Sequence, residues 1–141
     1  MPIDKDDELR RILAASKVVA TVGVSGNPDK PSYGIFAYLA DHGYHMIPIN
    51  PGTPEIQGLK TYADLSSVPE KIDVVQIFRK AEDVPPVVEE AIRVGARTIW
   101  MQEGIVNEEA ARAAEAAGLQ VVMDRCMRVT HRRLFGTGKV S

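Results

Sequence analysis

Five short apolar runs recur along the chain, and they are mostly continuous in apolar residues rather than alternating with polar ones. The runs span residues 17–23, 44–50, 73–78, 97–102 and 119–124. Continuous apolar strands are typical of a parallel sheet, because helices cover both faces of such a sheet. The runs therefore predict a five-stranded, mostly parallel sheet that is buried between two outer layers.

Helical segments separate these runs, and their ends carry residues that suit helix termini. We expect helices at residues 6–16, 32–43, 81–95 and 107–118. Pro85 and Pro86 fit only in the first turn of a helix. Asn107 suits an N-cap and Gly118 a helix stop. Strands that alternate with helices over short connections predict a doubly wound α/β fold, with residues 59–69 as an irregular insert.

Length and composition bound the possible functions. The 141 residues predict one domain, whose tail from 127 to 141 is expected to begin as a helix and then fray. A net charge of −2 gives no support for a nucleic-acid partner. No apolar run approaches the roughly 18 residues of a membrane span. Cys126 has no second cysteine to pair with, which favours a cytoplasmic location.

The stretch VGVSGNPDKPSYG, residues 22–34, joins the first predicted strand to the next helix. Ligands of doubly wound sheets bind beyond the C-terminal ends of the strands, where this stretch lies. Gly23 and Gly26 allow the backbone to approach a phosphate closely, while Ser25 offers a hydroxyl and Lys30 a charge. A tight turn without any ligand needs similar residues, so the stretch alone leaves both interpretations open.

Three known phosphate or nucleophile turns fit this stretch poorly. The P-loop pattern is absent. The dinucleotide pattern G-x-G-x-x-G is half present, because Ser25 stands at its second glycine. The second strand ends at Asn50, where a nicotinamide dinucleotide would need a carboxylate for its ribose. The hydrolase elbow G-x-S-x-G fails at Asn27. NAD is therefore disfavoured.

Motifs in a fixed order across the chain carry a resemblance to a known family. They are VATVGVSGNPDKPSYG, MIPINPG, DVVQIFR, TIWMQEGI and VVMDRCM, within residues 6–136. The chain resembles the small stand-alone CoA-binding proteins, which are similar to the N-terminal CoA-binding domain of the succinyl-CoA synthetase alpha subunit. The resemblance implies a Rossmann-like, three-layer domain that binds coenzyme A or acyl-CoA.

The resemblance and the strand ends together give a set of expected ligand contacts. The set includes the family's diphosphate turn and the loop after the second strand. It also includes the ends of the fourth and fifth strands. The expected cofactor-binding residues are Gly23, Val24, Ser25, Gly26, Asn27, Pro28, Lys30, Ser32, Tyr33, Asn50, Pro51, Phe78, Arg79, Trp100, Met101, Gln102, Arg125 and Cys126.

Two departures from the synthetase pattern limit what carries over. Thr53 stands where the synthetase has a lysine, so the cation for the adenosine 3′-phosphate is expected to be Lys30 or Arg79. The synthetase's catalytic histidine lies in a later domain that this sequence does not contain. Phe78, Trp100 and Met101 are expected to form an apolar wall for the ligand, and Phe78 and Trp100 fit the core equally well.

Other polar residues give weaker signals. His42 and His45 lack the spacing of a zinc site, so no metal is expected. No pair of carboxylates has a spacing that predicts acid–base catalysis, so no catalytic residue is assigned. The tail is basic, and a solvated helix face is favoured over a role in holding a polyanion. Its basic residues are Arg125, Arg128, His131, Arg132, Arg133 and Lys139.

The leading hypothesis is a CoA or acyl-CoA binding module without catalysis of its own. An NAD(P)-dependent oxidoreductase is one alternative. An accessory subunit of an acyl-CoA ligase or acetyltransferase is the other. A protein partner or a homo-oligomer is compatible with the sequence, whereas a nucleic-acid or membrane partner is not expected.

Overall fold

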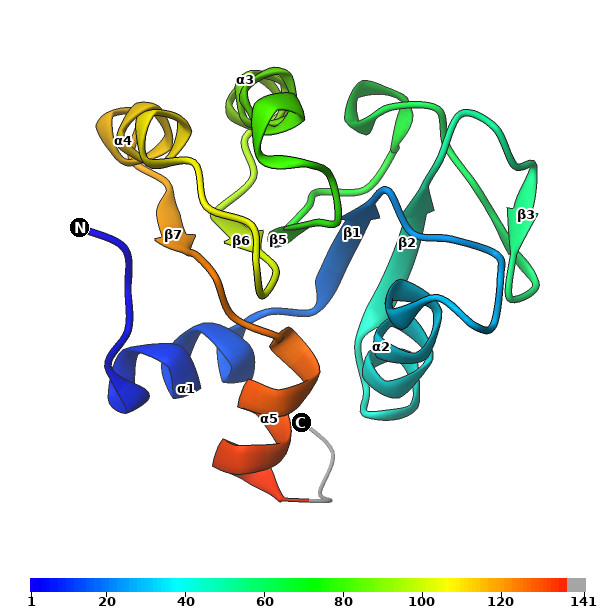
Figure 1. Ribbon diagram of the computed structural model, residues 1–141, viewed down its shortest axis with the longest axis horizontal. Helices are drawn as coiled ribbons and strands as arrows, with labels where there is room; N and C mark the ends of the chain where they lie inside the picture. The colour runs from blue at the N-terminus through cyan, green and yellow to red at the C-terminus, as the bar shows by residue number, and fades with distance from the viewer. Residues whose placement is uncertain (137–141) are drawn as a thin grey trace.

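The computed structural model describes residues 1–136, and its centre is a five-stranded sheet. The strands are β1 (Val18–Val22), β2 (His45–Ile49), β5 (Val74–Ile77), β6 (Thr98–Met101) and β7 (Gln120–Val122). Their order across the sheet is β2-β1-β5-β6-β7, and every pairing is parallel. The five apolar runs thus form the predicted strands, and the doubly wound fold is confirmed (Figure 1).

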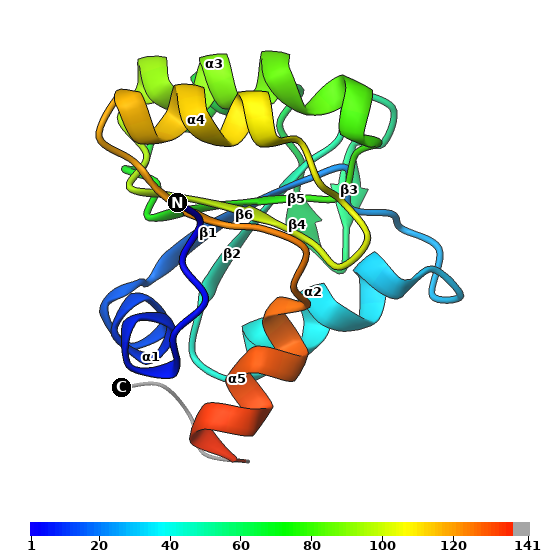
Figure 2. The ribbon, with the colours of Figure 1, turned by 60° about the vertical axis from the view of Figure 1, so that its left-hand side comes forward.

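Helices cover both faces of the sheet, as the apolar strands require (Figure 2). One face carries α3 (Val84–Val94) and α4 (Glu108–Ala116). The other carries α1 (Asp6–Ala15), α2 (Pro31–Asp41) and α5 (Met127–Phe135). Each helix layer has its own buried apolar cluster against the sheet, with Ile77 and Met101 in one and Phe36 and Trp100 in the other. The molecule is therefore a three-layer sandwich.

The helix ends follow the local signals in the sequence. The side chain of Asn107 caps α4 by accepting a hydrogen bond from the Ala110 N–H (2.9 Å). Gly95 ends α3 in the left-handed conformation (φ 79°), which a residue without a Cβ adopts at little cost. Pro85 and Pro86 lie in the first turn of that helix. No helix among the described residues is both long and apolar enough to cross a membrane.

The stretch between β2 and β5 is more ordered than the sequence indicates. It contains the short hairpin of β3 (Glu55–Ile56) and β4 (Leu59–Lys60), and the 3₁₀ turn Leu65–Ser67. Ile56 is buried in the apolar cluster beneath α2. The Gln57 side chain donates from Nε2 to the Tyr33 carbonyl (3.0 Å). The hairpin is therefore fastened to the first turn of α2, beside the loop that follows β1.

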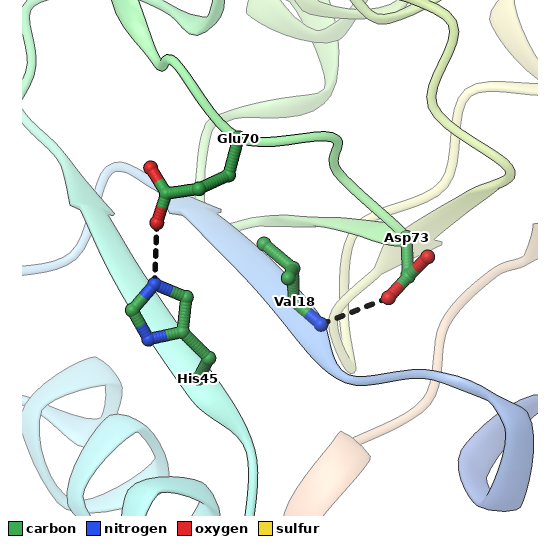
Figure 3. Close-up of polar contacts among 4 residues, drawn as sticks. All are labelled: Val18, His45, Glu70 and Asp73. Carbon is green, nitrogen blue, oxygen red and sulfur yellow. Dashed lines mark hydrogen bonds and ion pairs between the residues drawn. The ribbon is translucent and has the colours of Figure 1, made fainter.

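Side chains also fix the N-terminal ends of β1 and β2 (Figure 3). The Asp73 carboxylate accepts hydrogen bonds from the N–H groups of Lys17 and Val18, each at 2.9 Å. Glu70 pairs with Nε2 of His45 at 2.5 Å. Within residues 1–136, no group of three histidine, cysteine or carboxylate side chains lies close enough to hold a metal ion.

Each edge strand of the sheet has a neighbouring segment hydrogen-bonded to it. At the β7 edge, the Ile3 N–H donates to the Val121 carbonyl (2.7 Å). At the β2 edge, the Tyr62 N–H donates to the Pro48 carbonyl (3.0 Å), and its carbonyl accepts from the Asn50 N–H (2.9 Å).

Candidate functional site

A cleft of about 620 Å³ lies at the C-terminal edge of the sheet, between the loop after β1, the first turn of α2 and the start of α5. This is the edge at which doubly wound sheets bind their ligands. The residues that line it are Gly23, Ser25, Lys30, Pro31, Ser32, Ile35, Phe78, Gln102, Glu103, Ile105, Cys126, Arg128 and Val129.

The loop after β1 is shaped by its own side chains. The Ser32 hydroxyl accepts a hydrogen bond from the Ser25 N–H (2.9 Å), and the Ser25 hydroxyl accepts from the Asn27 N–H (3.0 Å). Asn27 in turn accepts from the Asp29 N–H (2.9 Å). Among the described residues, no protein acceptor meets the Gly26 N–H. Gly26 is exposed, so this donor is open to solvent.

Gly23 is required where β1 enters this loop. Its φ of 87° lies in the left-handed region, and a Cβ there would sit 2.7 Å from the Phe78 carbonyl oxygen. The Gly23 N–H also donates to the Ile49 carbonyl (3.0 Å), which holds the loop over the sheet. Only glycine lets the loop pass this close to the end of β5.

The N-terminus of α2 has the character of an anion site. No side chain caps it, and its first turn contains no acidic residue, whereas α1 and α4 each begin with acidic side chains. Lys30 stands at the N-cap position and Ser32 in the first turn, and both line the cleft. The positive end of the helix dipole therefore faces the cleft with no acidic side chain in the first turn of α2.

Two arginines add positive charge at this end of the sheet. Arg128, in the first turn of α5, lines the cleft and reaches toward α2, where a Cβ at Gly34 would lie 3.3 Å from its Nη1. The Arg79 side chain packs over Gly23, with its Cδ 3.3 Å from the position of a Cβ there. Across residues 1–136, neither arginine forms an ion pair with a carboxylate. Arg128 thus brings positive charge to the cleft wall, whereas Arg79 lies beside Gly23 without lining the cleft.

The apolar wall of the cleft differs from the expected one. Phe78 lines the cleft and is partly buried, as the sequence allows. Trp100 and Met101 have no exposed surface and lie in the two core clusters, so they supply no wall. The strand end itself lies under the cleft rather than in it. Ile105 and Val129 provide apolar surface instead.

Several other expected contacts lie near the cleft but do not line it. Val24 is fully buried, and its carbonyl accepts a hydrogen bond from Asn50 Nδ2 (2.9 Å). Asn50 and Pro51 line a separate pocket of about 310 Å³. The Arg125 side chain turns toward the N-terminal segment and donates to the Asp4 carbonyl (3.3 Å). The remaining members of the expected set, which lie around the loop and the start of α2, are Gly26, Asn27, Pro28 and Tyr33.

The expected residues that the structure does bring together on the cleft are Gly23, Ser25, Lys30, Ser32, Phe78, Gln102 and Cys126. Arg128 also lines the cleft, although the sequence indicated it only as one of the basic residues of the tail. Its position two residues after Cys126, at the start of a helix that follows the fifth strand, is the signal that could have found it. Lys139, from the same basic group, lies outside the described residues.

His131 contradicts the solvated helix face that the basic tail predicted. The residue is fully buried, and its Nδ1 lies 2.8 Å from the Tyr38 hydroxyl. The rings of Tyr38, His42, Tyr44 and Phe135 surround it at centroid distances of 5.2 to 6.0 Å. Its Nε2 has no hydrogen-bond partner among the described residues. Burial, followed by the nearby His42, lowers the pKa of His131 below its ordinary value.

We expect this histidine to make the protein less stable as the pH falls. The unfolded chain takes up the proton more readily than the folded one, so stability is lost below the ordinary histidine pKa of about 6.5. Thermal unfolding between about pH 7.5 and about pH 5.5 measures the effect. His131→Phe is expected to flatten this dependence, while His45→Gln, at an exposed histidine, keeps it. An equal slope in His131→Phe would contradict the assignment.

Comparisons with known proteins agree on the family. A family model described as a CoA binding domain matches residues 17–132. The "Uncharacterized protein YneT" of Bacillus subtilis is 40% identical over 124 residues, which cover 88% of this chain and 92% of that protein. A solved hypothetical protein from Pyrococcus horikoshii has a TM-score of 0.93 and 39% identity, covering 96% of this chain and 97% of that one.

More distant similarity links the chain to part of a larger enzyme. The alpha subunit of Acetate--CoA ligase [ADP-forming] I from Pyrococcus furiosus is 29% identical over 128 residues. The match covers 85% of this chain but 28% of the ligase subunit. This chain is therefore similar to one region of that subunit, and it spans little more than a quarter of its length.

Proposed function

Since this chain belongs to the CoA binding domain family, whose ligand is coenzyme A, we propose that it holds coenzyme A or an acyl-CoA in the cleft beyond the strand ends. The observation that carries this placement is the N-terminus of α2, which no side chain caps among residues 1–136 and which faces the cleft. Lys30 and Arg128 line the cleft beside it and form no ion pair within those residues. A diphosphate needs such a concentration of donors and positive charge.

The features of the cleft suggest an orientation for the ligand. The diphosphate lies on the loop after β1, where the Gly26 N–H and the Ser25 hydroxyl are donors. The adenosine end extends toward the pocket of Asn50 and Pro51, with Arg79 or Lys30 as the cation for its 3′-phosphate. The pantetheine arm runs the other way, past Phe78 to Gln102 and Cys126.

We further propose that the chain binds its ligand without transforming it. The cleft contains one carboxylate, that of Glu103. Among the described residues, no acid–base pair is formed around this carboxylate. An NAD(P)-dependent reaction fits less well, because Asn50 offers no carboxylate to a ribose and its amide is engaged by Val24. The cytoplasmic location stays a prediction from the single cysteine.

A second candidate function is that of an accessory subunit. The match to the alpha subunit of an acetate--CoA ligase favours it, since the chain is similar to one region of a protein that acts with CoA. A cleft that presents bound acyl-CoA to another chain would serve this role.

Isothermal titration calorimetry with CoA, acetyl-CoA, NAD and NADP tests the proposal. We expect CoA or acetyl-CoA to bind at least about tenfold more tightly than either nicotinamide dinucleotide, a difference of about 1.4 kcal/mol. Native mass spectrometry of the freshly purified protein identifies any ligand carried from the cell. Tighter binding of NAD or NADP would overturn the proposal in favour of the oxidoreductase, and no binding of CoA would overturn it outright.

The position of Cys126 on the cleft predicts a covalent adduct with the same ligand. When CoA disulfide is supplied, the Cys126 thiolate attacks one of its sulfurs, a mixed disulfide forms, and the other CoA leaves as a thiolate. We expect a mass increase of one CoA in intact-protein mass spectrometry, reversed by dithiothreitol and absent in Cys126→Ser. Wild-type protein that binds CoA yet forms no adduct would show that the pantetheine arm ends away from Cys126.

A further inference from the structure

Three polar side chains form a line through the centre of the sheet and end at the cleft. They are Thr21 on β1, Gln76 on β5 and Gln102 directly after β6. Gln102 donates from Nε2 to Gln76 Oε1 (2.7 Å), and Gln76 donates from Nε2 to Thr21 Oγ1 (3.1 Å). Thr21 and Gln76 are 0% exposed and Gln102 is 3% exposed.

Such a line is costly in the middle of a parallel sheet, where the neighbouring positions are apolar. Burying an amide is unfavourable unless its hydrogen bonds are made, and an apolar pair of similar shape would pack there without that requirement. The first two members have no contact with the cleft, whereas Gln102 lines it. The line therefore connects the interior of the sheet to one point on the cleft wall.

In the structure the side-chain amide nitrogens of Gln76 and Gln102 are both donors along the line. Thr21 Oγ1 accepts from Gln76, so Gln76 turns its own oxygen toward Gln102. The Gln102 amide nitrogen donates to that oxygen, which leaves Gln102 Oε1 for the cleft. Among residues 1–136, no protein donor meets this atom. The Gln102 backbone is held as well, because its carbonyl accepts from the Ile105 N–H (2.9 Å).

We propose that Thr21 and Gln76 are positioning residues that hold the Gln102 side-chain oxygen as an acceptor for an amide N–H of the pantetheine arm. This inference rests on the proposed function, since it assumes that CoA occupies the cleft. A primary amide without an internal partner is free to turn and present its NH₂ group, which cannot accept from another N–H. In the structure the line engages the Gln102 NH₂ group, which leaves the side-chain oxygen for a ligand that carries a donor at this point.

Binding of two ligands distinguishes positioning from general support of the fold. CoA has the pantetheine arm, and adenosine 3′-phosphate 5′-diphosphate has the same nucleotide without it. We expect Gln102→Leu and Gln76→Leu each to weaken CoA binding by about five- to tenfold, as one lost hydrogen bond does. Binding of the truncated nucleotide should stay within about twofold of wild type.

Isosteric substitutions at threonines provide the matched comparison. Thr21→Val removes the terminal hydroxyl of the line and is expected to weaken CoA binding by about threefold, while Thr21→Ser keeps it and binds as wild type does. Thr98→Val is the control, because Thr98 is also buried in the sheet and donates to Gln120 Oε1 (3.0 Å), at the strand ends opposite the cleft. This control should leave the affinity for both ligands unchanged.

Combining Gln76→Leu with Gln102→Leu shows whether the two residues act as one unit. The double variant should bind CoA no more weakly than the weaker single variant, because both changes remove the same interaction. Thermal unfolding by circular dichroism verifies the fold of each variant, and the Thr21 pair carries the test if Gln76→Leu does not fold.

The outcomes separate the positioning role from the proposed function. If wild type binds CoA and a folded Gln76→Leu protein binds it equally well, the positioning role is overturned and the proposed function stands. Equal losses for CoA and the truncated nucleotide, or additive losses in the double variant, also overturn it. If wild type binds neither ligand, the proposed function fails and the positioning role fails with it.

Discussion

Replacing Gly23 by alanine is expected to lower the free energy of unfolding by about 3 kcal/mol. Two causes add. The φ of 87° is unfavourable for a residue with a Cβ, and that Cβ would lie 2.7 Å from the Phe78 carbonyl oxygen. The clash is with backbone rather than with a flexible side chain, so the loop after β1 or the end of β5 must shift. Urea denaturation followed by circular dichroism measures the loss.

Two other glycines isolate the causes of this effect. Gly118 has a φ of 92° with no atom within 4 Å of an added Cβ, so Gly118→Ala should cost only about 1 kcal/mol. A Cβ at Gly26 would meet its nearest neighbour, Ile56, at an ordinary 3.8 Å. Gly26→Val should therefore fold, yet weaken CoA binding about tenfold if its side chain blocks the diphosphate. Equal stability of Gly23→Ala and Gly118→Ala would contradict the clash.

Replacing Arg128 by glutamine is expected to weaken CoA binding by at least about tenfold. Its guanidinium lines the cleft beside the start of α2, and it has no carboxylate partner among the described residues to compensate for its charge. Glutamine keeps a polar side chain of similar reach but removes the charge. Calorimetry at low and high salt should show a smaller salt dependence for the variant, because one ionic contact is missing.

Two comparisons assign the effect to one part of the ligand. Arg112→Gln, at an exposed arginine of α4 on the opposite face of the sheet, should leave the affinity unchanged. Dephospho-CoA lacks the 3′-phosphate, so an equal loss with CoA and dephospho-CoA assigns Arg128 to the diphosphate. A loss confined to CoA would place the 3′-phosphate at Arg128 instead of at Lys30 or Arg79. Unchanged affinity for both ligands would remove Arg128 from the site.

The sheet was predictable because its strands are apolar on both faces and each is followed by a helix with its own terminal signals. Residues such as Asn107 and Pro85 act within a few positions of themselves, so their effect can be read locally. The loop after β1 was predictable for the same reason. The hairpin of β3 and β4 was not, because Ile56 and Gln57 owe their order to contacts with α2 rather than to local sequence.

Side-chain direction marks the limit of what the sequence predicts for the site. Trp100 and Met101 stand at a strand end that borders the cleft, but a position along a strand does not show whether a side chain points into the core. His131 stands in a basic segment, yet the helical spacing from Met127 turns it inward with the buried face of α5. Gln76 is a polar residue within an apolar strand, and this position was a signal in the sequence that the predictions did not include.

The segments that cover the two sheet edges bear on how this protein meets other chains. An open strand edge is a template for strand addition and aggregation. Here Ile3 occupies part of the β7 edge and Tyr62 part of the β2 edge, while Pro48 within β2 has no N–H to offer. A second copy therefore meets part of each edge already occupied. With CoA in the cleft as proposed, a partner that docks on the rim of the cleft would lie within reach of the ligand.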